Sequence, residues 1–184
     1  MLAGTGKEVD KTNSKAAYYN VSAGALVAAS PVFRDMLSGS NIVQKDGAKI
    51  HICARGLNAR ALLYVLAIFH NRPDKLPDKV LIYKLGQIAV VVDALKCQEA
   101  VKIRGKMWCD AVKDLRCVQL PMPSEPFRGE HLLWLWATYV FRRADEFKKI
   151  TEILLRRAED EPYLTLRGVP IDNIIRKPSC HARM

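Results

Sequence analysis

The stretch "ASPVFRDML", residues 29–37, carries the clearest structural signal in the sequence. Pro31 disfavours helical geometry at Ser30 and suits the first position of a new helix, which Ser30 can cap. The apolar residues that follow share one face of about a turn and a half of helix: they are Val32, Phe33, Met36 and Leu37. We therefore predict a helical hairpin whose second arm packs on a core through this face. Leu26 is the core residue of the first arm, "AGALVAA", which Ser22 can cap.

The segments on either side of the hairpin predict strands. Residues 16–22, "AAYYNVS", are aromatic and β-branched, which is typical of a short strand. Residues 48–53, "AKIHIC", alternate polar and apolar side chains, as a half-buried strand does.

The chain beyond residue 57 favours helices. Asn58 is a suitable N-cap for "ARALLYVLAIFHN". Residues 80–95 are apolar over most of their surface; residues 88–92 could form a buried strand, but the length of the pattern favours a helix. Residues 98–115 predict an amphipathic helix. Its inward side chains are expected to be Val101, Met107, Trp108 and Val112.

A proline-rich segment divides the chain. "LPMPSEPF", residues 120–127, contains three prolines in eight residues and marks a linker over residues 119–128. The predicted organisation is a domain over residues 1–118 and a helical extension over residues 129–184. The extension contains two helices joined by a very short turn, and its tail from Asp160 is a mixture of turns and short apolar patches.

The composition is that of a globular intracellular protein. Apolar residues make up 49% of the 184 positions and charged residues 26%. The net charge of +10 is spread as +5, +2 and +3 over residues 1–80, 81–141 and 142–184. This distribution favours a mildly basic surface over a dedicated phosphate-binding face. No signal peptide is seen, and the apolar runs are too short to cross a membrane. We expect a soluble protein, with cytoplasm and nucleus not resolved.

The sequence offers no motif that carries chemistry. There is no phosphate-binding GxxxxGK[ST] loop and no GxSxG nucleophile elbow. The four histidines and five cysteines share no metal-ligand spacing. Asp93 lies within an apolar helix, where a capping or hydrogen-bonding role is favoured over a catalytic one. We therefore predict no enzymatic activity, catalytic residue, metal or cofactor.

With these elements placed, the chain resembles a BTB/POZ domain of the divergent kind common in filamentous fungi, with a C-terminal helical extension. The resemblance covers about residues 16–158. It begins at "YYNVSAGALVAASPVFRDML" and continues through "AKIHICARGLNARALLYVLAIFHNRPDKLP". The stretch "IAVVVDALKCQEAV" with Trp108 downstream, and "WLWATYVFRRADEFKKITEILL" after the linker, complete it. The structural core of the family motif falls on Leu26, Pro31, Val32, Phe33, Met36, Leu37, Asp93 and Trp108.

The resemblance implies an α+β fold, with helical hairpins packed on a small three-stranded sheet and followed by the extension. Family members usually begin with a strand of the form D-V-x-L-x-V, and only "MLA" stands here where that strand would end. Whether this strand is missing is left open by the sequence. Family members that bind a cullin-type ubiquitin-ligase scaffold often carry hydrophobic-x-Glu after the hairpin. This chain has Ile42, Val43 and Gln44 there, with Gln in place of Glu.

The function that the resemblance implies is protein interaction. We expect self-association, as in a homodimer, or docking of a protein partner, with Ile42, Val43 and Gln44 as the candidate partner-binding loop. A ubiquitin-ligase substrate adaptor that binds a cullin and a simple oligomerisation scaffold are both open. The alternative is a nucleic-acid-associated or transcription-linked factor that uses its basic surface. The even spread of charge makes nucleic acid the less favoured partner, and no membrane partner is expected.

Overall fold

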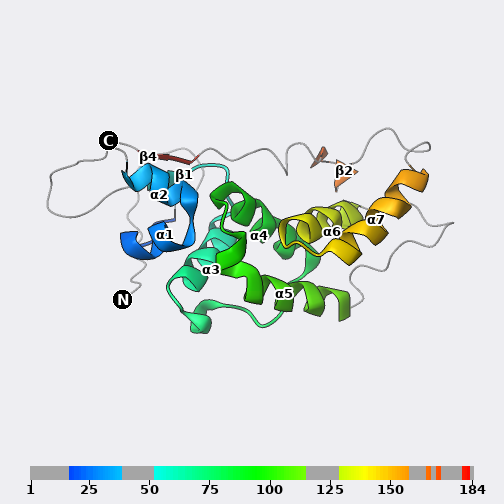
Figure 1. Ribbon diagram of the computed structural model, residues 1–184, viewed down its shortest axis with the longest axis horizontal. Helices are drawn as coiled ribbons and strands as arrows, with labels where there is room; N and C mark the ends of the chain where they lie inside the picture. The colour runs from blue at the N-terminus through cyan, green and yellow to red at the C-terminus, as the bar shows by residue number, and fades with distance from the viewer. Residues whose placement is uncertain are drawn as a thin grey trace, which may run out of the picture.

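The computed structural model describes residues 17–38, 52–114 and 129–157, and the backbone of short strands between residues 165 and 182. Seven α-helices make up most of the described chain (Figure 1). Helices from both sides of the predicted linker contribute to one hydrophobic core. The linker itself, residues 119–128, lies outside the described residues.

The helical hairpin forms where the sequence predicts it. Helix α1 spans Ala23–Ala29 and α2 spans Pro31–Ser38. Between them, the Ser30 hydroxyl oxygen accepts a hydrogen bond from the Phe33 N–H at 3.3 Å, which is the expected capping contact. Ser22 stands at the N-cap of α1, but its side chain makes no capping bond. Its backbone N–H instead donates to Nε2 of His70 at 2.8 Å.

Three longer helices form the centre of the fold. Helix α3 spans Ala59–Phe69, α4 spans Ile82–Leu95 and α5 spans Gln98–Asp114, with the short 3-10 helix η1 at Pro73–Lys75. Asn58 caps α3 through a bond from the Ala61 N–H. Residues 88–92 are helical, so the strand alternative is wrong there. The chain turns from α4 into α5 at Lys96, whose φ of 51° is left-handed.

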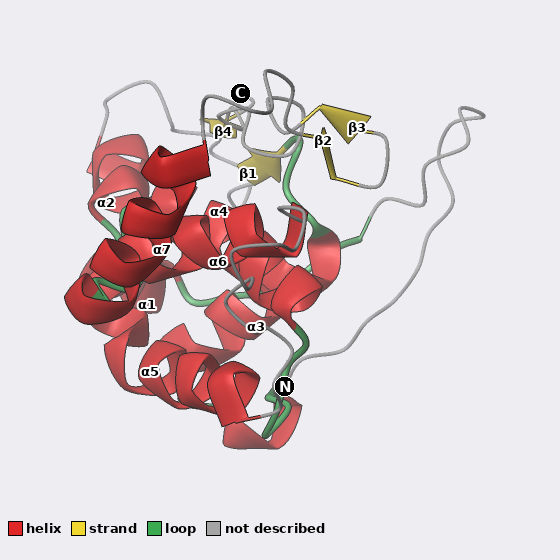
Figure 2. Cartoon of the chain, turned by 90° about the vertical axis from the view of Figure 1, so that its right-hand side faces the viewer, coloured by secondary structure: helices red, strands yellow, loops and turns green. Residues whose placement is uncertain are grey.

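The two helices after the linker pack against the centre. Helix α6 spans Gly129–Val140 and lies across α4, and α7 spans Ala144–Arg157 and folds back on α6 (Figures 1 and 2). Two glycines permit close contact: Gly86 of α4 faces Leu133, and Gly105 of α5 faces Phe141. A Cβ atom on either glycine would lie within 3 Å of its neighbour.

The α+β fold with a three-stranded sheet is wrong. Strands in the described residues occur only as two antiparallel pairs of two or three residues each: β1 (Ile52–Ala54) with β4 (Cys180–Ala182), and β2 (Thr165–Leu166) with β3 (Val169–Pro170). The core is built by helix-on-helix packing instead, so no central sheet is needed to cover the apolar helix faces.

The predicted strand at residues 16–22 also does not form in its described part, residues 17–22. This segment makes its hydrogen bonds with α3 and its C-terminal end. The Tyr19 hydroxyl donates to the Ala59 carbonyl at 2.8 Å, and the Ser22 N–H donates to His70. The second predicted strand is described only from residue 52, where β1 begins.

Candidate functional site

The residues of the family-like motif have different surroundings in the structure. Leu26, Phe33 and Trp108 are buried in the core. Val32 is half-buried, as are Met36 and Leu37, which pack against the core, and Pro31 is exposed. Asp93 accepts a hydrogen bond from Lys96 Nζ at 2.8 Å, which is a hydrogen-bonding role at the end of α4. The candidate loop, Ile42 to Gln44, lies outside the described residues.

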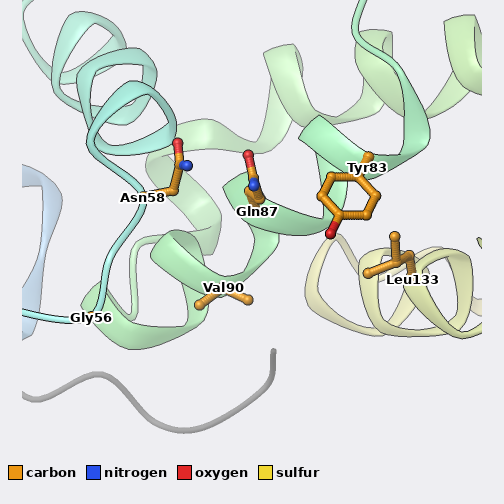
Figure 3. A pocket seen from close by; sticks show the side chains of 6 residues that line it. All are labelled: Gly56, Asn58, Tyr83, Gln87, Val90 and Leu133. Carbon is orange, nitrogen blue, oxygen red and sulfur yellow. The ribbon is translucent and has the colours of Figure 1, made fainter. Parts of the chain in front are cut away.

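One shallow cavity of about 220 Å³ lies between α4, α6 and the turn before α3 (Figure 3). Tyr83, Gln87 and Val90 of α4 line it, together with Leu133 of α6 and Gly56 and Asn58 of the turn. The Asn58 side chain is occupied in capping α3, and Gln87 accepts a hydrogen bond from Lys84 Nζ at 2.8 Å. The described residues of this lining carry amide and phenol groups but no carboxylate, imidazole, thiol or ammonium group. It supplies no acid–base pair of the kind that general acid–base catalysis needs.

The described thiols are buried. Cys97 and Cys109 are free and almost fully covered, and burial raises the pKa of each thiol to about 12. Because the thiolate is the reactive form, neither is an activated nucleophile. Within the described part of the chain, no three His, Cys, Asp or Glu side chains gather to hold a metal ion. None of the helices described there has the length and apolar composition of a membrane-spanning helix.

Helix α5 presents an apolar row on its outer side. The prediction that Met107 points inward is wrong: its side chain is 51% exposed, and that of Ile103 is 80% exposed. These two residues lie one helical turn apart, and exposed Ala100 and half-buried Ala111 continue the same line at helical spacing. We call these four residues the α5 outer row. Figures 1 and 2 both show α5 along the lower edge of the molecule.

The other large exposed apolar side chains of the described residues lie outside the helices, line the cavity or stack on neighbouring rings. Tyr18 and Leu81 lie outside the helices, and Tyr83 of α4 lines the cavity described above. Tyr139 lies 5.8 Å from the ring of Trp136 and 5.9 Å from that of Phe147, measured between ring centroids. Among the large exposed apolar side chains of the described residues, only Ile103 and Met107 lie one helical turn apart on a helix. The α5 outer row is therefore the candidate interaction surface in this part of the chain.

Basic side chains flank the α5 outer row. Lys102 and Lys106 lie on the side of α5 nearer the α6–α7 turn and are exposed. Arg104 lies on the opposite side, where its guanidinium stands 6.0 Å from the centroid of the Trp108 ring. Among the described residues, neither Lys106 nor Arg104 forms an ion pair with a carboxylate. Lys102 forms one with Glu99, with 3.6 Å between the charged atoms.

The acidic side chains nearby are paired within the protein. Glu99 lies 2.6 Å from an Arg142 guanidinium nitrogen, and Asp110 lies 2.7 Å from one of Arg143. Arg143 also bonds Glu146 at 2.6 Å, and this bond is the main reason that the pKa of Glu146 is lowered. These pairs connect α5 to the α6–α7 turn and neutralise the local carboxylates. Among the side chains that the structure describes here, the charge left unpaired beside the row is that of Lys106 and Arg104, which is positive.

Sequence reasoning missed this row, although a signal for it was present. Val101, Trp108 and Val112 share one face of α5, and Ile103 falls on the opposite face. Because Met107 was expected to point inward, its position on the same helix face as Ile103 was not recognised.

Comparison with known proteins identifies no relative. No protein-family model matches the chain. No curated protein matches its sequence. No solved structure matches it either.

Proposed function

We propose that the protein is a non-enzymatic interaction module that docks a protein partner on the outer face of α5. The observation that carries this proposal is the exposure of Ile103 and Met107 together on one helix face. A partner that covers this row would remove apolar surface from water. Each Å² buried in this way stabilises the complex by roughly 25 cal/mol. The resemblance to BTB/POZ domains, which act by binding proteins, supports the same class of function.

A photo-crosslinking experiment tests the proposal. The photoreactive amino acid p-benzoylphenylalanine is placed at position 103 in the full chain, and at Lys148 as a matched exposed helical position on α7. After irradiation in extract of cells that express the chain, we expect a covalent adduct with one protein, identified by mass spectrometry. The adduct should form from position 103 only, and Met107→Ser should abolish it.

Two results would contradict the proposal. Equal adducts from positions 103 and 148, or no protein adduct from either, would show that the α5 outer row is ordinary surface. An adduct with nucleic acid in place of protein would favour the alternative function through the basic side chains.

A further inference from the structure

We infer that the partner segment which covers the α5 outer row is an acidic amphipathic helix. This inference rests on the proposed function and adds the chemistry of the partner to it. Three features of the surface carry it: the spacing of the row, the internal hydrogen bonding of α5, and the sign of the unpaired charge on its two sides.

The spacing of the row matches a helical partner. Ala100, Ile103, Met107 and Ala111 follow one another at intervals of three or four residues, which is the apolar seam that one helix presents to another. The 17 residues of α5 give the seam a straight support of about 25 Å at 1.5 Å rise per residue. The small residues at the two ends and the large ones in the centre leave room for large apolar side chains of a partner to pack beside Ile103 and Met107.

The backbone of α5 cannot pair with a single extended peptide. Its peptide groups bond within the helix and offer no free edge, so a strand laid on this face would leave its own backbone unpaired. Buried peptide groups without partners are costly. A partner helix satisfies its peptide groups internally and contributes only side chains to the contact.

The charges on the two sides of the row select an acidic partner. Lys106 lies on one side and Arg104 on the other, and neither forms an ion pair with a described carboxylate. Lys102 pairs with Glu99, and Glu99 and Asp110 are held by Arg142 and Arg143. Glutamates that flank the apolar seam of a partner helix would meet unpaired positive charge on both sides. A second copy of this face would bring like charges together, which disfavours self-pairing through α5.

The probe for the inference is a synthetic peptide of about three heptads, with leucine at a and d and glutamate at the other positions. A second peptide carries lysine in place of every glutamate, and a DNA duplex of comparable length forms the third arm. Binding to the full chain is measured by fluorescence anisotropy. We expect the glutamate peptide to bind at least about tenfold more tightly than the lysine peptide.

Variants separate the apolar and charge contributions. Ile103→Ser with Met107→Ser, and separately Lys106→Glu, should each weaken binding of the glutamate peptide by about tenfold or more. Lys148→Glu, which makes the same charge change on α7, should leave binding within about twofold. Equal binding of the two peptides, or tight binding that survives the double serine variant, would overturn the inference.

The remaining arm distinguishes the two proposals. If the DNA duplex binds more tightly than the glutamate peptide and depends on Lys106 but not on Ile103, the surface is a phosphate site and the inference fails. If position 103 crosslinks a protein but the peptides do not discriminate by charge, the acidic helix is wrong and the proposed function stands.

Discussion

The hydroxyl of Ser30 donates a hydrogen bond to the backbone carbonyl of Leu95, 65 residues further along the chain, at 2.5 Å. Leu95 ends α4, where helix carbonyl groups have no partner within the helix. The same hydroxyl oxygen accepts the Phe33 N–H that starts α2. One fully buried side chain therefore caps one helix and joins it to the end of another.

Replacing Ser30 with Ala should lower the free energy of unfolding by about 1–3 kcal/mol, because it leaves a buried carbonyl and an amide without their partner. Urea denaturation followed by circular dichroism measures the change. Ser38→Ala, at the exposed end of α2, is the control and should alter stability by less than about 0.5 kcal/mol. Equal effects at the two serines would show that the buried bond is unimportant.

Gly105→Ala should destabilise the protein, although alanine is the better helix former. The added Cβ would lie 2.5 Å from a ring carbon of Phe141, so α5 and the chain after α6 would have to move apart at a cost of about 1–3 kcal/mol. At Gly24 in α1 the nearest atom would be 3.8 Å away, and Gly24→Ala should be neutral or stabilising. Thermal melts of both variants test this; a stabilised Gly105→Ala protein would disprove the close contact.

The thiols of Cys97 and Cys109 should resist modification in the folded protein. Their pKa values of about 12 leave almost no thiolate at pH 8, and both side chains are covered. Iodoacetamide labelling followed by peptide mass spectrometry should find both unmodified in buffer and both modified in denaturant. Labelling of either at the rate of a free thiol in native buffer would contradict its burial.

Glu146→Gln should remove a pH-dependent part of the stability. The Arg143 guanidinium lowers the pKa of Glu146, so its carboxylate stabilises the fold above the pKa of the unfolded state. That contribution is lost as the pH falls through the folded-state pKa. At neutral pH we expect a loss of about 1 kcal/mol, discounted for partial exposure.

The stability difference between wild type and Glu146→Gln should then shrink as the solution is acidified through the carboxyl range. Denaturation curves across this range measure it. Glu152→Gln on α7, an exposed position, is the control. If the stability difference stays constant with pH, the effect of the substitution does not come from the charge of Glu146.

Some of the fold follows from neighbouring residues alone. Pro31 and Ser30 start α2, and Asn58 starts α3, because a cap acts within three or four residues of itself. The length of the apolar pattern likewise predicts α4 in place of a strand. These elements can be read from the sequence because the forces that specify them are local.

Which faces of the helices are buried depends on contacts between residues far apart in the sequence. The aromatic residues before α1 predicted a strand, but Tyr19 bonds the carbonyl of Ala59. Trp108 is held inward by a 2.9 Å hydrogen bond from its indole nitrogen to the Pro77 carbonyl, while its neighbour Met107 lies in solvent. Amphipathic spacing predicts that a helix has an apolar and a polar face. Which residues of the helix are buried depends on packing against segments tens of residues away in the sequence. Local sequence patterns therefore predict where the helices form, whereas long-range packing leaves Ile103 and Met107 exposed.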